Sequence, residues 1–276
     1  LLEAGPRDAW WNWKIHMPAA LMYNLMDDRY NWYYHTEPQP YMNDRVMYWP
    51  RGRVLGGSSS LNAMVYIRGH ALDYDRWAFK ENCEGWSYQE ILPYFRRAEH
   101  REKGGDAYRG DGGPLWVHTA DQHNPLFDAF IQAAQQAGYA ATEDMNGYRQ
   151  EGFGKMDMTI HHGRRWSTST AFLRPAEKRP NMRVETSAFV LRVLFEGNRA
   201  VGVEFSQNGR IVRYRAEREV ILSGGAGTRL WPLSRNASLN LTALMNNALA
   251  LADRIGKTPD SMFNLLRAEQ VAIVGA

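Results

Sequence analysis

The chain has 276 residues, of which 44% are hydrophobic and 23% charged, and its formal net charge is +3 at pH 7. This composition is typical of a globular protein with one large or two ordinary domains, and it excludes a disordered or collagen-like chain. The basic residues are spread along the chain, which argues against nucleic-acid binding, and the single cysteine, Cys83, excludes an internal disulfide and a cysteine-rich metal site.

The N-terminal stretch LLEAG indicates the end of a strand, closed by Glu3. A carboxylate at the end of such a strand accepts hydrogen bonds from the adenosine ribose in dinucleotide folds. Taken alone, however, a strand that ends in Glu-Ala-Gly is more often followed by a simple turn without a cofactor. The chain begins without Met, so we expect both ends to be cut from a longer protein, and a targeting signal is not readable. Residues 6–50 are rich in Pro, Asp, Asn and aromatic side chains, which predicts loops and short helices.

The next segment, RGRVLGGSSSLNAMVYIRG (51–69), joins two glycines and three serines to an apolar run. Adjacent glycines let the main chain approach a flat ring or a pyrophosphate without a Cβ clash, and the flanking apolar residues argue against a flexible linker. Helices are predicted at 72–80 and 88–100. A turn cluster follows at 108–113 and a strand at 114–119.

A further helix is predicted over 124–139, with Asn124 as N-cap, Pro125 at the first helical position and Gly138 near the C-cap. From residue 181 the pattern alternates as in strands, with turns at 196–198 and at Asn208-Gly209, which predicts an antiparallel meander. The apolar run 220–222 suggests a strand buried on both faces of a parallel sheet. A helix over 236–256 and a short buried strand over 269–276 complete the expected elements, and the fold class is α/β with mixed α+β character.

Residues 51–69 resemble the first signature of the glucose–methanol–choline (GMC) oxidoreductases, flavoproteins that oxidise alcohols. The segments WKIHMPAALMYNLMDDRYNWYYHTEPQ, EDMNGYRQEGFGKMDMTIHHGRRWS and REVILSGGA extend the resemblance, in the family's order, over residues 1 to about 226. It implies a fragment of an FAD-binding domain, with a parallel sheet and the antiparallel meander, plus part of a substrate domain. The implied boundaries are 1–69 for the first FAD-binding part, 70–155 for the substrate-domain part, 156–226 for the return to the FAD-binding domain and 227–276 for an unrelated tail.

The resemblance also implies cofactor contacts. Glu3 would bind the adenosine ribose of FAD, Gly56, Gly57, Ser58 and Asn62 would line the flavin and its pyrophosphate, and the backbone of Val190 would meet the adenine. Leu61 stands where family members with covalent FAD have a histidine, so the FAD is expected to be noncovalent. Arg165 and Ser167 would be packing or cap residues.

The implied reaction is the oxidation of a primary alcohol, most closely choline to betaine aldehyde, on the way to glycine betaine. It needs a base, usually His, and an aromatic box for the trimethylammonium group. None of the eight histidines matches the family's catalytic position, and His161-His162 are interpreted as solvated turn residues, so no catalytic residue is named. The aromatic residues are individually better explained as core or interface residues. No metal is implied.

The electron acceptor is unknown, and localisation is not readable from the sequence. The family suggests the bacterial cytoplasm or inner-membrane face, or the mitochondrial inner membrane. No apolar run approaches the roughly 18 residues that span a bilayer, which leaves peripheral membrane contact open.

The stretch ILSGGAGTRLWPLSR (221–235) departs from the family. It resembles the nucleotide-binding loop of mannose-1-phosphate guanylyltransferases and related sugar nucleotidyltransferases, but the Pro-Lys pair expected after that loop is absent from 236–246. We therefore interpret 223–227 as the junction between two sequences of different origin, one similar to the GMC family and one unrelated to it. The expected product is an inactive fragment, with a nucleotidyltransferase or a non-functional fusion as alternatives. VAIVGA (271–276) resembles the first strand of a dinucleotide fold and would lie beside Leu1–Leu2 if that sheet recruited it.

Overall fold

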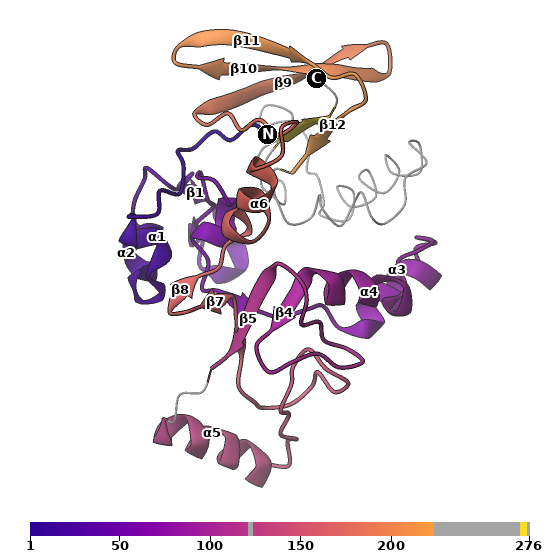
Figure 1. Cartoon of the computed structure of the whole chain (residues 1–276). Coiled ribbons are helices and arrows are strands. Elements are labelled where there is room, and N and C mark those ends of the chain that lie inside the picture. The colour runs from indigo at the N-terminus through magenta and orange to yellow at the C-terminus, as the bar shows by residue number, and fades with distance from the viewer. Residues whose placement is uncertain (121–123, 224–270, 275–276) are drawn as a thin grey trace. The chain divides into compact units, whose positions relative to one another are not determined.

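The computed structural model describes residues 1–120, 124–223 and 271–274 (Figure 1). Its contacts fall into two units. Unit 1 comprises Leu1–Asn62 and Ser167–Ala276, and unit 2 is Ala63–Trp166. Unit 2 is therefore one continuous segment, whereas unit 1 is assembled from two pieces of chain. The assignment of these units to FAD-binding and substrate domains stays a prediction.

The first piece of unit 1 consists of short elements joined by loops, as its composition predicted. They are α1 (Trp13–His16), η1 (Pro18–Ala20), α2 (Leu21–Leu25), β1 (Tyr34–His35), η2 (Pro40–Met42), β2 (Tyr48–Trp49) and η3 (Gly57–Ser60). β1 and β2 pair antiparallel. Ile15, Val54 and Leu61 form a buried cluster that joins α1 to the segment around η3.

The second piece carries η4 (Ser169–Leu173), α6 (Arg174–Glu177) and the predicted meander of β9 (Ala188–Glu196), β10 (Arg199–Gln207) and β11 (Arg210–Arg215). These strands form an antiparallel sheet in the order β11-β10-β9 (Figure 1). Asn208 and Gly209 have φ of 52° and 75° at the β10–β11 turn. Positive φ at both central residues is the type I′ geometry that the Asn-Gly pair favours, so the predicted hairpin is confirmed.

The N-terminal residues lie beside the segment that leads into β9. Leu2 forms a parallel bridge with Glu185. Around that bridge, the Glu3 amide donates to the Glu185 carbonyl at 2.9 Å and the Ala188 amide donates to the Glu3 carbonyl at 2.9 Å. Leu2 then packs in one buried cluster with Ala188, Val203 and Phe205.

Strand β12 (Glu219–Leu222) corrects two expectations. It pairs antiparallel with β13 (Val271–Val274), so the parallel pairing expected for 220–222 is wrong. Leu222 is 45% exposed, because a two-stranded sheet does not cover both faces of its strands. The partner of the VAIVGA strand is thus β12 and not Leu1–Leu2. The helix predicted over 236–256 lies outside the described residues.

Unit 2 combines helices with a four-stranded sheet of order β3-β6-β5-β4, in which β4 and β5 pair parallel. Its elements are β3 (Val65–Tyr66), α3 (Ala71–Phe79), α4 (Tyr88–Ala98), β4 (Glu99–Arg101), β5 (Leu115–Thr119), α5 (Pro125–Gln136), β6 (Asp157–Met158), β7 (Ile160–His161) and β8 (Arg164–Arg165). The three predicted helices are confirmed. Asn124 caps α5, since its Oδ1 accepts from the Leu126 amide at 3.0 Å.

The centre of unit 2 is polar. Arg109 is completely buried, and its guanidinium contacts Glu99 at 2.5 Å, Asp144 at 2.5 Å and Asp157 at 2.7 Å. Arg68 adds a second buried cation, 2.6 Å from Glu99. Burial alone would lower the pKa of Arg109, but the hydrogen bond with Glu99 and the surrounding carboxylates raise the pKa above its usual value. Each buried charge is thus paired, which is the condition for keeping charges inside a protein.

Two absences hold for the described part of the chain. No helix within it is long and apolar enough to cross a membrane. Likewise, its His, Cys, Asp and Glu side chains form no group of three or more suited to a metal ion.

Candidate functional site

The segment 51–62, here called the Gly-Ser loop, folds tightly because of its glycines. A Cβ on Gly52 would lie 2.2 Å from the carbonyl carbon of Gly57, so only glycine fits there. Gly56 and Gly57 have φ of 89° and 54°, in the left-handed region that favours glycine. The loop thus turns sharply just before η3.

Serine hydroxyls hold this turn from within. The Gly52 amide donates to Ser58 Oγ at 3.0 Å, and Ser60 Oγ donates to the Leu55 carbonyl at 2.8 Å. Gly56, Gly57 and Ser60 are buried, whereas Ser58 is half-buried. The side chains of Ser58 and Ser60 therefore contribute to holding the Gly-Ser loop in its folded form.

The residues after unit 2 form a second wall against the loop. A Cβ on Gly56 would lie 2.5 Å from Ser60 Oγ and 3.1 Å from Ser169 Cβ. Ser169 begins the π-helical turn η4, and its buried Oγ has no hydrogen-bond partner among the described residues. π-helical turns are rare in proteins, and those that occur are often found at functional sites.

Arg165 and Ser167 are buried, as the resemblance implied. Ser167 Oγ accepts from the Thr170 amide at 3.3 Å, so Ser167 does act as a local cap. Burial lowers the pKa of the Arg165 guanidinium to about 10.

Glu3 lies next to the Gly-Ser loop. Its side chain is fully buried, and its Oε1 accepts from the Gly5 amide at 2.7 Å. A Cβ on Gly5 would lie 1.9 Å from the Arg53 carbonyl oxygen, and the Leu55 amide donates to the Pro6 carbonyl at 3.0 Å. The end of the N-terminal strand is therefore pressed directly against the start of the loop.

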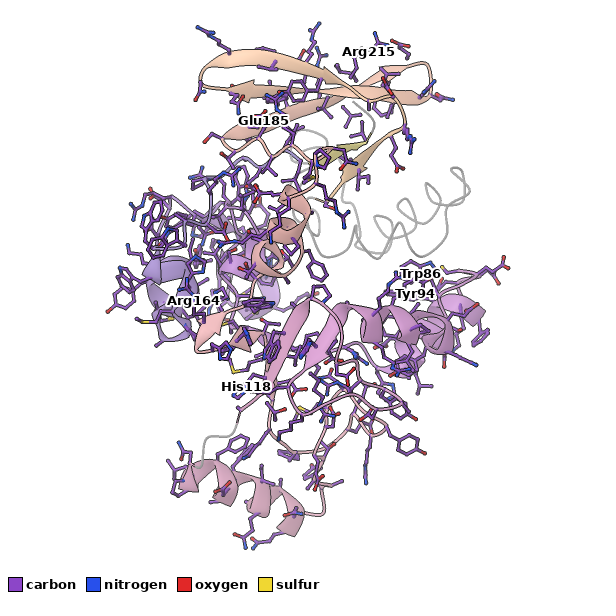
Figure 2. The ribbon with its side chains drawn as sticks, in the orientation of Figure 1. Trp86, Tyr94, His118, Arg164, Glu185 and Arg215 are labelled. Carbon is purple, nitrogen blue, oxygen red and sulfur yellow. The ribbon has the colours of Figure 1, made fainter. Side chains whose placement is uncertain are left out.

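Val190 lies on β9 opposite Phe205 of β10 and is half-buried. The start of β9 is bonded to Glu3 through the Ala188 amide. Glu185 precedes this strand and accepts from Gln207 Nε2 at 3.3 Å (Figure 2). All six residues predicted to contact the cofactor therefore fall in unit 1: Glu3, Gly56, Gly57, Ser58, Asn62 and Val190.

This arrangement fits the FAD that the family resemblance implies. The buried Glu3 carboxylate follows the parallel bridge at Leu2, and the glycine turn of the adjoining loop, with positive φ, leaves no room for side chains. These are the two features by which a protein accepts a ribose and lets its backbone approach a ring or pyrophosphate. Leu61 is buried with Ile15 and Val54 and offers no nucleophilic atom for a covalent bond. The individual contacts and the noncovalent attachment stay predictions.

The histidines of unit 2 correct one expectation. His161 is half-buried on β7, with its ring 3.8 Å from Trp116 and 3.9 Å from His162, so it is not a solvated turn residue. Trp116 also stacks on His100 at 4.0 Å, and burial together with His162 lowers the pKa of His161. His118, labelled in Figure 2, pairs with Glu102 instead. His162 itself is exposed.

Sequence reasoning did not identify Thr168, whose hydroxyl lies 3.0 Å from Ser59 Oγ of the Gly-Ser loop, 109 positions away. Nor did it indicate the buried charges of Arg68 and Arg109, since a lone arginine in a turn cluster is usually solvated. Only the density of hydroxyls in WSTST (166–170) was a local signal.

Comparisons with known proteins identify a family for the part of the chain that precedes the tail at 227–276. The chain matches the GMC oxidoreductase family over residues 19–228. A shorter match, to the nucleotidyl transferase family, covers residues 218–254, which mostly lie outside the described residues.

Curated relatives show high identity. The chain is 62% identical over 231 residues to the mitochondrial choline dehydrogenase of Mus musculus, covering 82% of this chain and 39% of that protein. It is 50% identical over 228 residues to the oxygen-dependent choline dehydrogenase of Staphylococcus xylosus, covering 82% of this chain and 40% of that protein. The chain thus spans about two fifths of these relatives.

Solved structures agree as well. Pyridoxine 4-oxidase from Mesorbium loti superposes with a TM-score of 0.77 at 34% identity, covering 82% of this chain and 44% of that one. An FAD-dependent oxidoreductase from Chaetomium thermophilum gives a TM-score of 0.72 at 26% identity, covering 82% of this chain and 40% of that one.

Proposed function

The chain belongs to the GMC oxidoreductase family, and from this membership we propose that it is the flavin-binding part of an enzyme that oxidises choline to betaine aldehyde. The observation that carries the proposal is the 62% identity to a choline dehydrogenase over 231 residues, which is 82% of this chain. An FAD-dependent structural neighbour supports the cofactor.

In this proposal each predicted contact has a distinct task. The Glu3 carboxylate accepts hydrogen bonds from the ribose hydroxyls, and the backbone of Val190 borders the adenine. Gly56, Gly57, Ser58 and Asn62 line the flavin and the pyrophosphate, where side chains larger than Ser would obstruct the approach. With Leu61 in the attachment position, the FAD is held noncovalently.

The oxidation transfers a hydride and a proton from the alcohol. Bound FAD would supply the acceptor for the hydride of the alcohol carbon, and the hydroxyl proton would pass to a general base. The product, betaine aldehyde, leads to glycine betaine. The electron acceptor that returns the flavin to its oxidised state is unassigned.

We further propose that this 276-residue piece does not oxidise choline by itself. It spans 39% of the mouse relative, and none of its eight histidines matches the family's catalytic position. Choline-dependent reduction of an artificial electron acceptor by the purified, FAD-supplemented chain would contradict this.

Peripheral membrane contact is also part of the proposal. Large apolar side chains of the first piece of unit 1 are exposed: Trp10, Trp11, Trp13, Met17, Met22, Tyr23 and Met26. Exposed Trp and Tyr beside Lys14 and Arg29 suit the interface of an anionic bilayer. Co-sedimentation with phosphatidylserine vesicles tests this, and equal binding by Trp10→Ser/Trp11→Ser and the unchanged protein would count against it.

The cofactor assignment is tested by titrating the apoprotein with FAD and following the quenching of flavin fluorescence. We expect saturable binding, weakened about fivefold to tenfold by Glu3→Gln, because the amide loses one acceptor for the ribose. Glu196→Gln is the matched control, since Glu196 is an exposed carboxylate paired with Arg215. GTP and mannose-1-phosphate serve as competing ligands in a thermal-shift assay. A shift with these and none with FAD would favour the nucleotidyltransferase alternative, and no shift with any ligand would favour a non-functional fusion.

A further inference from the structure

Thr168 touches the Gly-Ser loop at its sharpest point. Its Oγ1 donates to the Gly56 carbonyl at 3.2 Å and lies 3.0 Å from Ser59 Oγ. The Thr168 amide also donates to Ser59 Oγ at 2.9 Å. Two of these contacts join Thr168 to Ser59, 109 positions earlier, and the third joins Thr168 to Gly56; we call the three together the Ser59–Thr168 clasp.

The Gly56 carbonyl is the common acceptor of this clasp. Besides the Thr168 hydroxyl, it accepts from Ser59 Oγ at 2.5 Å and from the Ser59 amide at 3.2 Å. Gly56 has φ of 89°, a backbone conformation that would otherwise exchange with others because glycine is permissive. Donors on its carbonyl fix the orientation of the Gly56–Gly57 peptide and thereby of the turn into η3.

The clasp also lies where the two pieces of unit 1 meet. The chain leaves unit 1 after Asn62 and returns at Ser167, one residue before Thr168. Ser59 and Thr168 are each half-buried, and the hydroxyls of Ser58 and Ser60 bond to backbone groups of the loop, Gly52 and Leu55. The returning segment thus supplies a hydroxyl that the loop does not contain.

We propose that Thr168 is a positioning residue for FAD, holding the Gly-Ser loop through Ser59 and the Gly56 carbonyl in the conformation that receives the cofactor. This inference rests on the proposed function, and it assigns to Thr168 no contact with the flavin itself. The affinity for FAD then depends on the Thr168 hydroxyl and not only on the bulk of its side chain.

The test compares Thr168→Val, which keeps the shape and removes the hydroxyl, with Thr168→Ser, which keeps the hydroxyl. We expect Thr168→Val to weaken FAD binding about fivefold to tenfold, as for the loss of one or two hydrogen bonds, and Thr168→Ser to remain within about twofold. The matched control is Thr36→Val, because Thr36 Oγ1 also forms a hydrogen bond with the backbone of unit 1. There it accepts from the Met47 amide at 3.0 Å. The control is expected to leave FAD affinity within about twofold.

A second readout separates positioning from general stabilisation. The visible absorption band of bound flavin responds to the polarity and contacts of its surroundings, so we expect Thr168→Val to shift it and Thr36→Val to leave it in place. Ser59→Ala combined with Thr168→Val is expected to weaken binding less than the sum of the single changes, because the two hydroxyls act as one clasp.

Several outcomes would overturn the inference. The inference is wrong if Thr168→Val binds FAD as the unchanged protein does, with or without a lower melting temperature of the apoprotein, or if Thr168→Ser binds FAD as weakly as Thr168→Val. Failure of the unchanged protein to bind FAD would instead refute the proposed function, so the two failures are distinguishable.

Discussion

Two constraints favour glycine at position 56: the backbone conformation and the lack of space for a Cβ atom. The φ of 89° at Gly56 disfavours any side chain, and the space beside this residue is occupied by Ser60 and Ser169. Gly197, at the turn between β9 and β10, shares the positive φ of 58° but has nothing within 4 Å of a Cβ. The pair therefore separates the backbone effect from the steric one.

We expect Gly56→Ala to destabilise unit 1 by about 2–4 kcal/mol and Gly197→Ala by about 1 kcal/mol, because only the first substitution adds overlap to backbone strain. Urea denaturation followed by circular dichroism measures both. Equal losses would mean that the Gly-Ser loop relaxes around the added methyl group.

Arg109 presents a second kind of constraint at this scale. Removing its guanidinium leaves Glu99, Asp144 and Asp157 close together without their shared cation. We expect Arg109→Met to destabilise unit 2 by about 3–5 kcal/mol, as for other buried ion pairs that lose one partner. Arg215→Met, which breaks the exposed pair with Glu196, is expected to change stability by less than about 1 kcal/mol. Hydrogen exchange is followed in unit 2 peptides for Arg109→Met and in unit 1 peptides for Arg215→Met, and an equal loss of protection in the two variants would refute the prediction.

At the scale of elements, α5 shows how local chemistry sets a helix boundary. Asn124→Ala removes the acceptor for the Leu126 amide and is expected to cost about 1 kcal/mol, whereas Asn124→Asp keeps that acceptor. Hydrogen exchange at the first turn of α5 measures fraying directly. If Asn124→Asp frays as much as Asn124→Ala, the cap is not what begins the helix.

The same contrast explains which elements the sequence could predict. Asn124 and the Asn208-Gly209 pair act within a few positions of themselves, so the start of α5 and the β10–β11 hairpin were correctly predicted. The partner of β12 lies some fifty positions away, and apolarity alone does not distinguish a parallel from an antiparallel neighbour. His161 was misjudged for a similar reason, because Trp116 covers it from another strand.

The candidate site was predictable where residue type alone carries the chemistry. The glycines at 56 and 57 and the carboxylate of Glu3 predicted a cofactor-binding site, and these residues do fall in one unit. The Ser59–Thr168 clasp was not predictable, because threonine forms such hydrogen bonds in many places. The residues next to Thr168 in the sequence do not indicate that its partner is the Gly-Ser loop.

At the scale of the whole molecule, the two units should respond differently to pH. Burial and the neighbouring His162 and His100 lower the pKa of His161 in the folded state, while Glu102 opposes them. Between the ordinary and the lowered pKa the unfolded state binds more protons, so the stability of unit 2 falls as pH decreases through about 6.5. Unit 1 does not contain this cluster.

We therefore expect unit 2 peptides to lose protection against hydrogen exchange between pH 8 and pH 5, after correction for the intrinsic exchange rate. His161→Phe keeps a ring against Trp116 and should reduce this dependence. An unchanged dependence in His161→Phe would assign the effect to other groups.

The division of unit 1 into two pieces has a consequence for synthesis. The Glu3 amide donates to the Glu185 carbonyl, 182 positions later, and the Ala188 amide donates to the Glu3 carbonyl. At about 5–20 residues per second, the ribosome delivers these partners of Glu3 roughly 10–40 seconds after the N-terminal residues. Unit 2 is one continuous segment, so it is translated in full while Glu3 and the Gly-Ser loop are still waiting for their partners. During that interval the exposed tryptophans and the incomplete cofactor site are available to chaperones, and we expect this part of the nascent chain to bind them.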